Sequence, residues 1–415
     1  MSSSWLIIAD DLTGAADCGI AFAKRGVESV VAWDKHIDVD NVQVLSVDAG
    51  TRRLSAEEAG RRQVAVLAAH YRSGLRLYKK IDSTMRGQPA AELAALMVFP
   101  DAQFRGRPRL AILAPAFPGT GRSTVNGRVV VGGTPLEHTP FWAPDQMHAS
   151  ASWPEILASA GLSADILPLK VSVRGPEAVT AHLKSARQRG LAAVVCDGKT
   201  ESDLAAVAAG SWPLADEVIW VGSAGLADAL AVVDVDAAPT PKIPVINPVS
   251  KSVLIIVGTL AEASRLQSQA LVDAGLVYRI VISPDALFAG PSSPGWRQAS
   301  RQLSDSFAGR YDVLLEIEQV AKPDLSRGAQ LAECLADLAD SAGRGFGALV
   351  ATGGDTVYAL LSKMGVHSIR LLDEVDPGVP LGLTVGALSI PVVTKAGAFG
   401  GALSLRRSLE RLRHS

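Results

Sequence analysis

The segment Trp5-Leu6-Ile7-Ile8-Ala9-Asp10-Asp11-Leu12-Thr13-Gly14 joins an unbroken apolar run to a polar turn. A run of this kind, without alternation, is typical of a parallel strand that helices cover on both faces. The polar groups stand just past the carboxyl end of the strand, the edge at which open α/β sheets bind ligands. The segment therefore predicts an α/β fold with a site built from strand-end loops.

The same pattern, an apolar run that ends in small or polar residues, recurs along the whole chain. It is found at residues 44–47, 111–113, 194–196, 219–221, 254–257, 349–351 and 392–393. Alanine-rich stretches with helical character lie between these runs, for example at residues 56–69 and 177–189. Strands that alternate with helices predict largely parallel sheets.

The length of 415 residues exceeds a comfortable single core and predicts two α/β domains. The clearest break in composition is residues 235–248, where four prolines stand among small residues. Proline cannot donate to a strand ladder, so this stretch is interpreted as an interdomain connection and a candidate hinge. We place one domain at residues 1–240 and the other at 250–415, with the active site in the cleft between them. Residues 290–296 are expected to form a surface loop.

The net charge of the chain limits the kinds of partner that it is expected to bind. The net charge is −2 and the pI is about 6.4, which argues against binding to nucleic acid or to an anionic membrane surface. The expected partners are small molecules, and the sequence leaves open whether the chain forms a homo-oligomer.

The cysteine content bears on the compartment. Cys18, Cys196 and Cys334 are far apart and odd in number, which favours a reducing compartment and a cytoplasmic protein. No apolar run approaches the length needed to cross a bilayer.

The densest chemistry lies in Tyr78-Lys79-Lys80-Ile81-Asp82-Ser83-Thr84-Met85-Arg86-Gly87. A carboxylate, two hydroxyls and a guanidinium follow an apolar run within five positions, which predicts a site for a small polyhydroxylated anion. Asp10 and Asp11 are candidates for a magnesium ligand or a general base. The alternative is that one of these two aspartates caps the helix that begins near Thr13 while the other is solvated, and that Asp82 with Ser83 caps a helix.

Arg52 follows another strand end, in Asp48-Ala49-Gly50-Thr51-Arg52. Its planar guanidinium can bind a carboxylate through two hydrogen bonds, so Arg52 is a candidate clamp for an acid group. A solvated surface arginine is the alternative.

Two glycine-rich loops follow strands in the second half, Thr352-Gly353-Gly354-Asp355-Thr356 and Lys395-Ala396-Gly397-Ala398-Phe399-Gly400-Gly401. Glycine lets the backbone approach an anion closely, and a helix N-terminus offers free amides. Together the loops predict a cradle for nucleotide phosphates. The alternative is a tight turn with Asp355 as an N-cap. Neither loop is a P-loop, and the glycines at 343–347 precede a strand, unlike a dinucleotide fingerprint.

Taken in order, these motifs resemble the four-carbon acid sugar kinase family, long catalogued as a domain of unknown function. The resemblance covers nearly the whole chain and is carried by residues 8–15, 80–87, 115–118 with 121–122, 352–356, 377–380 and 395–400. It implies an N-terminal domain that binds the acid sugar and a C-terminal domain that binds ATP, with Mg²⁺ as the usual companion of ATP. The metal ligands stay unassigned.

The resemblance implies roles for individual residues. The expected substrate contacts are Asp10, Asp11, Arg52, Lys80, Ile81, Asp82, Ser83 and Arg86. The expected ATP contacts are Thr259, Gly353, Gly354, Asp355, Thr356, Lys395, Gly397, Ala398, Phe399 and Gly400. Asp82 is the first choice for accepting the hydroxyl proton and Asp11 the second. The chain departs from the family at Gly258-Thr259-Leu260-Ala261, where a second serine is usual.

The expected reaction is transfer of the γ-phosphoryl group of ATP to the terminal (4-) hydroxyl of D-threonate or D-erythronate. The form Lys-Ile-Asp-Ser-Thr at residues 80–84 is similar to the D-threonate branch, and a 3-oxo-tetronate 4-kinase is the alternative. An aspartyl-phosphate phosphatase would need two aspartates separated by one residue, whereas Asp10 and Asp11 are adjacent. A non-catalytic nucleotide sensor is the remaining alternative.

Overall fold

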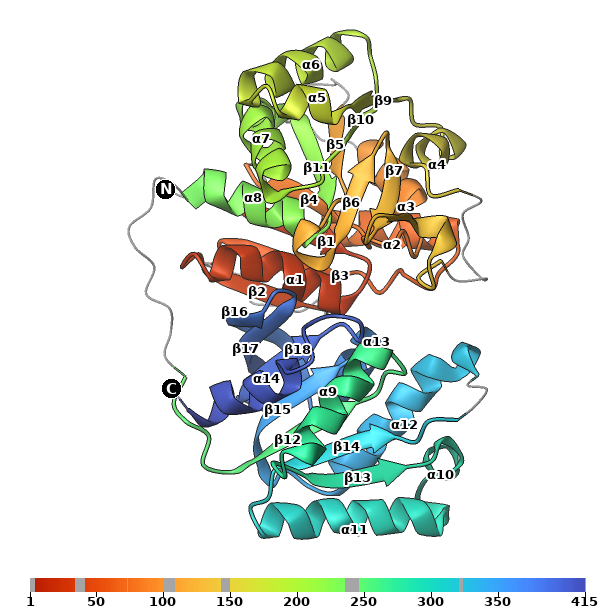
Figure 1. Cartoon of the computed structure of the whole chain (residues 1–415), viewed down its shortest axis with the longest axis vertical. Helices are drawn as coiled ribbons and strands as arrows, with labels where there is room; N and C mark the ends of the chain where they lie inside the picture. Colours follow the sequence, from red (N-terminus) through yellow and green to blue (C-terminus); the bar gives the residue numbers. More distant parts are fainter. Residues whose placement is uncertain are drawn as a thin grey trace. The chain divides into compact units, whose positions relative to one another are not determined.

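The computed structural model describes residues 4–33, 42–72, 74–99, 109–142, 150–235, 246–320 and 324–414. The chain divides into two compact units, Met1–Pro241 and Lys242–Ser415. Figure 1 colours the first unit from red to green and the second from green to blue. The connection expected at residues 235–248 falls mostly on residues 236–245, which lie outside the described residues.

The first unit is built on a sheet in the order β2-β3-β1-β4-β11-β5-β10-β9, and its neighbouring strands pair in parallel. These strands are β1 Trp5–Ala9, β2 Ser29–Ala32, β3 Val44–Asp48, β4 Arg76–Lys80, β5 Leu110–Ala114, β9 Ala164–Leu167, β10 Ala193–Cys196 and β11 Val218–Gly222. A small antiparallel sheet consists of β6 Arg122–Val125, β7 Arg128–Val131 and β8 Thr134–Pro135. The prediction of an α/β fold with largely parallel strands is confirmed for this unit.

Helices cover both faces of this sheet. They are α1 Leu12–Ala23, α2 Ala56–His70, α3 Pro89–Met97, α4 Trp153–Ser159, α5 Leu169–Ser172, α6 Pro176–Gln188, α7 Glu201–Ser211 and α8 Ala224–Val235. Short 3₁₀ turns occur at η2 Pro118–Thr120, η3 Leu136–His138 and η4 Trp212–Glu217. α1, α8, α7 and α6 pack in succession on one face, and α2, α3 and α4 pack in succession on the other (Figure 1). Double coverage explains why central strands such as β1 and β5 are apolar along their whole length.

The topology places β1 at a switch point. β1 lies between β3 and β4, while α1 and α2 contact different sets of helices. In open α/β sheets a ligand crevice forms where successive connections leave toward opposite sides, at the carboxyl ends of the strands. The loops after β1, β3 and β4 therefore meet at the place where such a sheet binds its ligand.

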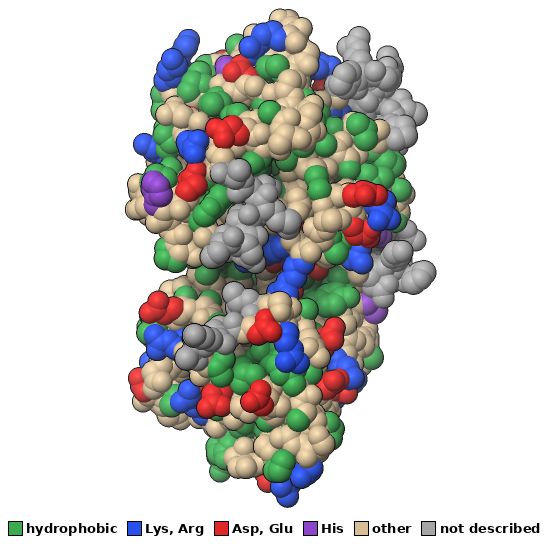
Figure 2. All heavy atoms as spheres, turned by 90° about the vertical axis from the view of Figure 1, so that its right-hand side faces the viewer, with side chains coloured by type: hydrophobic (Ala, Val, Ile, Leu, Met, Phe, Trp, Pro, Cys, Tyr) green, Lys and Arg blue, Asp and Glu red, His purple; other side chains and the backbone are tan. Residues whose placement is uncertain are grey.

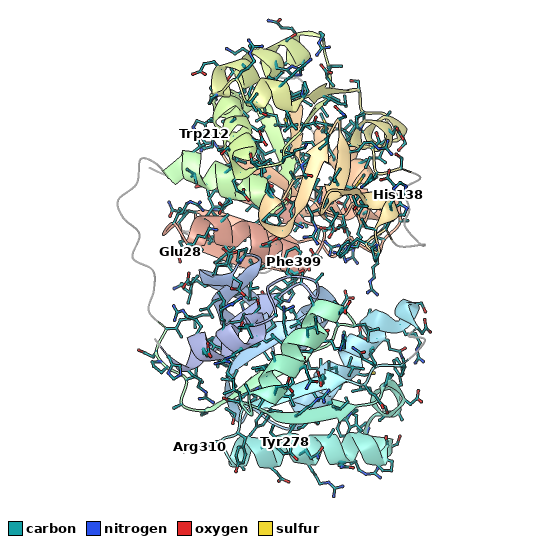
Figure 3. The ribbon with its side chains drawn as sticks, viewed as in Figure 1. Glu28, His138, Trp212, Tyr278, Arg310 and Phe399 are labelled. Carbon is teal, nitrogen blue, oxygen red and sulfur yellow. The ribbon has the colours of Figure 1, made fainter. Side chains whose placement is uncertain are left out.

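A cluster of tryptophan rings packs within the first unit. The rings of Trp5 and Trp220 have centroids 5.2 Å apart, and Trp212, labelled in Figure 3, lies 6.3 Å from Trp5. The guanidinium of Arg76 stands 4.1 Å from the centre of the Trp212 ring, and the Trp5 indole donates a 2.9 Å hydrogen bond to Asp234. Tilted aromatic packing and a cation over the ring face both add to simple burial.

The second unit has the strand order β13-β14-β12-β15-β18-β17-β16. Its strands are β12 Ser252–Val257, β13 Tyr278–Ile282, β14 Val313–Ile317, β15 Phe346–Thr352, β16 Val366–Asp376, β17 Val379–Gly386 and β18 Pro391–Lys395. The neighbouring strands in the part β13-β14-β12-β15-β18 of this order pair in parallel. β17 runs antiparallel to both of its neighbours, β18 and β16. The predicted α/β class therefore holds here too, with an antiparallel hairpin at one side.

The helices of this unit are α9 Glu262–Asp273, α10 Pro284–Ala289, α11 Pro294–Ala308, α12 Gly328–Ser341, α13 Gly354–Lys363 and α14 Ser404–Arg413, with 3₁₀ turns η5 Gly290–Ser292 and η6 Leu325–Arg327. The prediction of a surface loop at residues 290–296 is wrong in its second half. α11 begins at Pro294, because proline suits the first helical position, and Trp296 is buried.

Charged side chains of both signs are mixed over the described part of the face in Figure 2. This mixture agrees with the near-zero net charge. Within the described residues, no helix combines the length and apolar character that crossing a membrane requires.

Candidate functional site

Asp11 and Asp10 occupy the loop after β1 and have different local roles. Asp11 is the N-cap of α1, where its Oδ1 accepts a 2.9 Å hydrogen bond from the amide of Gly14 and its Oδ2 accepts one of 2.7 Å from the Thr13 hydroxyl. Capping therefore accounts for part of Asp11, as the alternative interpretation expected. Asp10 caps nothing and is buried.

Arg52 binds both aspartates with one guanidinium. Its Nε and Nη2 donate to Asp10 at 2.7 and 3.1 Å, and its Nη1 and Nη2 donate to Asp11 at 2.6 and 2.8 Å. Nη2 also lies 3.5 Å from Oδ2 of Asp82. The interpretation of Arg52 as a solvated surface residue is wrong. Its predicted role as a clamp for the substrate carboxylate stays a prediction, since the protein's own carboxylates already hold it.

Asp82 organises a tight turn after β4 instead of capping a helix. Its Oδ1 accepts hydrogen bonds from the amide and the hydroxyl of Thr84, and its Oδ2 accepts one of 2.6 Å from Arg86. The next helix, α3, begins only at Pro89. The interpretation of Asp82 with Ser83 as a helix cap is therefore wrong, and Ser83 is buried within the turn.

Two further predicted contacts lie on β4 or directly after it. Lys80 is buried at the end of the strand, and Ile81 packs its side chain into the hydrophobic core. The Ile81 amide donates a 2.9 Å hydrogen bond to the carbonyl of Gly222, so Ile81 can offer a ligand only its backbone carbonyl. A methyl group at Gly14 would overlap the Lys80 ammonium and come within 2.6 Å of Oδ1 of Asp11. Glycine at this position gives the lysine its room.

Burial and charge act together on the ionisable groups of this edge. Burial by itself raises the pKa of Asp10, but Arg52 and Lys80 outweigh it and hold that pKa below its usual value. Burial likewise opposes ionisation of Asp82, yet Arg86 and Arg52 hold its pKa well below the usual range. Burial lowers the pKa of Lys80, but Asp10 and Asp11 outweigh this and raise it. These groups are therefore charged at neutral pH.

Asp48, which the sequence motifs left unassigned, behaves in the opposite way. It is buried at the end of β3, and its Oδ1 accepts a 2.7 Å hydrogen bond from the amide of Gly50. Burial first, and then the charge of Asp11, raise its pKa to about 7. The strand-end rule that selected Asp10 and Asp82 applies equally to Asp48 and is the signal that finds it.

Arg122 is a second residue without a predicted role, although it belongs to a recognised motif. It is buried at the start of β6, and burial lowers its pKa more than the nearby Asp82 raises it. Arg122 therefore brings a further guanidinium close to the Asp82 turn.

The second unit gathers three glycine-containing loops after β12, β15 and β18. A methyl group at Gly258 would overlap Thr356, and one at Gly397 would overlap the side chain of Thr259. Gly353 has a φ of 93°, a left-handed value that favours glycine. The loops thus approach one another more closely than residues with a Cβ would allow.

Two helices begin among these loops without a side-chain cap. α9 starts after Ala261 and α13 after Gly353, and neither residue supplies a capping hydrogen bond. Asp355 is exposed in the first turn of α13 and is not its N-cap, so the capping interpretation of Asp355 is wrong. Uncapped amides and two positive dipole ends form an anion-binding arrangement.

Lys395 stabilises the glycine loop at residues 396–401 through hydrogen bonds from its buried side chain. Its ammonium donates to the hydroxyl of Ser264 at 3.0 Å and to the carbonyls of Ala396 and Gly397 at 3.1 and 3.2 Å. An ammonium has three donors, and these contacts use all of them. Burial lowers the pKa of Lys395 to about 7. Its predicted contact with a phosphate stays a prediction, and its present partners make it a support of the loop.

Gln267 is a support that the sequence motifs did not reveal. From α9 its amide nitrogen donates to the carbonyls of Phe399, Gly400 and Gly401 at 3.2, 3.2 and 2.9 Å. Phe399, labelled in Figure 3, packs where a methyl group at Gly378 would overlap its ring. This contact explains why the motif at residues 377–380 accompanies the glycine loop.

Within the described residues, no group of three or more histidine, cysteine, aspartate or glutamate side chains is arranged to hold a metal ion. Magnesium usually binds through one or two carboxylates together with substrate phosphates and water. The residues present are therefore compatible with Mg²⁺ that arrives on a nucleotide.

Comparisons with known proteins cover both units. A model of a sugar-binding N-terminal domain matches residues 5–230, and a model of a nucleotide-binding C-terminal domain matches residues 254–405. A D-threonate kinase of Cupriavidus necator is 37% identical over 99% of both chains. A D-erythronate kinase of Heliobacterium modesticaldum is 27% identical over 96% of this chain and 95% of its own. A 3-oxo-tetronate kinase of Methylobacterium radiotolerans is 26% identical over 99% of this chain and all of its own.

Solved structures share the fold. A Salmonella typhimurium LT2 protein, described as a tRNA synthase, is similar with a TM-score of 0.79 at 20% identity over 98% of both chains. At this level of identity the likeness concerns the fold alone.

Proposed function

The chain belongs to the four-carbon acid sugar kinase family, and from this membership we propose that it uses ATP to phosphorylate the 4-hydroxyl of D-threonate or D-erythronate. The observation that carries the proposal is the cluster of Asp10, Arg52, Lys80 and Asp82 at the switch point of the first sheet. This cluster offers fixed cations for a carboxylate and fixed carboxylates for hydroxyl groups. The full-length similarity to a D-threonate kinase supports the same substrate class.

The first unit would bind the acid. Lys80 and Arg86 stay protonated because neighbouring carboxylates raise their pKa values, so both can attract a carboxylate at any physiological pH. Arg52 would orient the acid through its guanidinium group, which Asp10 and Asp11 hold in place. Arg122 is a further candidate for the carboxylate, since it lies near the Asp82 turn.

Asp82 is proposed to accept the proton of the attacking hydroxyl, with Asp11 as the second choice. The low pKa of Asp82 keeps it ionised but makes it a weak base. Phosphoryl transfer needs little covalent help from the protein, because alignment and charge stabilisation contribute most. A weak but fixed base is compatible with that chemistry.

The second unit would bind ATP. The amides at the starts of α9 and α13 face the glycine loops and would cradle phosphate oxygens. Thr259 supplies one hydroxyl where the family usually has two. Mg²⁺ would neutralise phosphate charge, as is usual in phosphoryl transfer.

A coupled assay for ADP with a panel of four-carbon acids tests the proposal. The purified chain, MgATP and each of D-threonate, D-erythronate, their enantiomers and the 3-oxo acids would be compared. We expect ADP to form only when an acid is present, and fastest with D-threonate or D-erythronate. Preference for a 3-oxo acid would select the alternative kinase, and ADP release independent of any acid would overturn the proposal. Nucleotide binding without turnover on any acid would indicate a sensor.

The variant Arg52→Ala tests how the acid is held. Losing a charged hydrogen bond of roughly 1.5–3 kcal/mol should raise the KM for the acid by about 10–150-fold and leave the KM for ATP nearly unchanged. The matched variant Arg122→Ala decides which guanidinium holds the substrate carboxylate. The alcohol threitol, which lacks that carboxylate, should be a poor substrate of the wild type. An unchanged acid-to-alcohol preference in Arg52→Ala would remove Arg52 from this role.

A further inference from the structure

Behind the acid-binding edge lies a chain of four polar side chains, to none of which the sequence motifs gave a role. The Lys79 ammonium is 2.8 Å from Oε2 of Glu92, and Oε1 of Glu92 accepts a 2.5 Å hydrogen bond from the hydroxyl of Thr51. That hydroxyl in turn accepts a 3.0 Å hydrogen bond from the amide of Gln63. All four residues are at most 1% exposed.

The four residues come from separate elements of the first unit. Lys79 belongs to β4, Glu92 to α3 and Gln63 to α2, while Thr51 stands in the loop between β3 and α2. Their sequence separations hide the arrangement, because each partner is distant along the chain. Only the folded sheet brings them together, directly beneath the strand ends that carry the acid-site side chains.

Each link ends next to a residue of the acid site. Thr51 precedes Arg52, and its amide donates a 3.1 Å hydrogen bond to the carbonyl of Asp10. Lys79 precedes Lys80, and its ammonium donates a 2.8 Å hydrogen bond to the Lys80 carbonyl. The backbone positions of Asp10, Arg52 and Lys80 are thereby coupled through one set of buried contacts.

Stability alone is a poor reason for this arrangement. Removing an ammonium and a carboxylate from water carries a large penalty, and well-packed apolar residues of similar volume often stabilise a core as well or better. A buried polar network fixes a unique geometry to the extent that its groups are paired. Here Lys79, Glu92 and Thr51 are paired, and Oε1 of Gln63 is the buried side-chain atom of the network that has no hydrogen-bond partner among the described residues. The position of this network beneath three strand ends gives that rigidity a use.

We propose that Thr51, Gln63, Lys79 and Glu92 are positioning residues, which hold the loops of Asp10, Arg52 and Lys80 in the spacing that the sugar acid requires. The inference rests on the proposed acid kinase activity. It assigns these residues no contact with substrate. Loosening the network would let the three loops move independently and would weaken acid binding before it affected the nucleotide.

The substitution Thr51→Val tests this role. Valine keeps the volume and the backbone amide but removes the hydroxyl that joins Glu92 to Gln63. We expect the KM for the acid to rise about tenfold while the KM for ATP stays within about twofold of the wild type. Thr51→Ser restores the hydroxyl and should recover the wild-type KM. A structural role alone would lower the melting temperature of Thr51→Val without this division between the two substrates.

A control separates the network from general loosening of the core. Ser211→Ala removes another fully buried hydrogen bond of the same unit, the 2.9 Å bond from the Trp220 indole, and should leave the KM for the acid unchanged. If Thr51→Val does not fold, Gln63→Met removes one link, and a smaller rise in the KM for the acid is expected. Unchanged acid kinetics in the folded variants, or equal changes for acid and ATP, would overturn the inference. Absence of turnover by the wild type on every acid would instead refute the proposed function.

Discussion

The two units arrange polar groups at their sheet edges in opposite ways. In the first, charged side chains are paired with one another, as Arg52 is with Asp10 and Asp11. In the second, the edge is made of glycine loops and helix starts, and the buried Lys395 donates its hydrogen bonds to neutral oxygens. The difference teaches that two α/β sheets can present anion sites of different kinds: fixed side-chain charge, which suits a small acid with several hydroxyls, and backbone amides, which suit phosphates.

Asp82→Asn should have the largest effect and would show whether the charged edge performs chemistry. If Asp82 accepts the proton, its loss should lower kcat by about 10²–10⁴-fold. ATP affinity should stay unchanged, because the nucleotide is assigned to the other unit. Single-turnover kinetics together with calorimetric titration of ATP measure both quantities. Ser211→Ala, which removes the buried hydrogen bond from the Trp220 indole in the same unit, is the control. A near-normal kcat in Asp82→Asn would transfer the role to Asp11.

Asp48→Asn should reveal how much stability the chain loses when the buried Asp48 carboxyl ionises. The folded pKa of Asp48, about 7, lies above the ordinary 3.8, so its contribution to stability is present below pH 3.8 and is lost as the pH rises through 7. The difference corresponds to at most about 4 kcal/mol. Asparagine keeps the acceptor for the Gly50 amide but cannot ionise.

We therefore expect Asp48→Asn to be more stable than the wild type at pH 8 and similar to it at pH 4. Urea unfolding at both pH values measures this, with Asp48→Ala as the variant that also removes the acceptor. Equal stability at pH 8 would mean that Asp48 ionises normally in the folded chain.

Matched substitutions of two glycines would test whether the edges are independent. Gly14→Ala crowds Lys80 and Asp11, and Gly258→Ala crowds Thr356. The first should weaken binding of the acid and the second binding of ATP, each by about 10–150-fold if one charged hydrogen bond of roughly 1.5–3 kcal/mol is lost. Titration of both ligands into both variants gives a crossed result when the assignment is right. Loss of both affinities in either variant, with normal melting, would contradict the separation.

Ser264→Ala should have the smallest effect and would sharpen the description of the second edge. The serine hydroxyl accepts from Lys395 and donates a 2.7 Å hydrogen bond to the carbonyl of Gly397. Lys395 keeps its two carbonyl acceptors in the variant, so the main loss is the neutral hydrogen bond to Gly397. A loss of about 0.5–1.5 kcal/mol should raise the KM for ATP by about 2–12-fold and leave the KM for the acid unchanged. Ser268→Ala on the same helix is the control, and equal values for the two variants would show that the loop does not depend on Ser264.

The sequence allowed the strands and the strand-end loops to be predicted, because both follow from local order. The apolar run Trp5–Ala9 forms β1 as expected. The strand expected at residues 392–393 is β18, Pro391–Lys395, which has Lys395 as its last residue. Residues 290–296 were misjudged, since proline also favours the first position of a helix, and Pro294 begins α11.

Side-chain partners could not be predicted in the same way. Arg52 and Asp10 are separated by 42 residues, and nothing local indicates that the guanidinium binds two aspartates. Glu92 and Gln267 stand inside helices, where their sequence surroundings resemble those of any solvated polar residue. Their partners follow from strand order and from how helices pack over the sheet, which are properties of the whole unit.

The aromatic cluster of the first unit gives the molecule an unequal optical character. Of the seven tryptophans only Trp296 belongs to the second unit, and Trp5, Trp212 and Trp220 lie with ring centres 5.2–6.3 Å apart. Ultraviolet emission from the chain therefore reports mainly on the first unit, and electronic coupling within the trio should mark its near-ultraviolet circular dichroism. With Trp296 replaced by phenylalanine, the same light would follow the first unit alone as the whole chain unfolds.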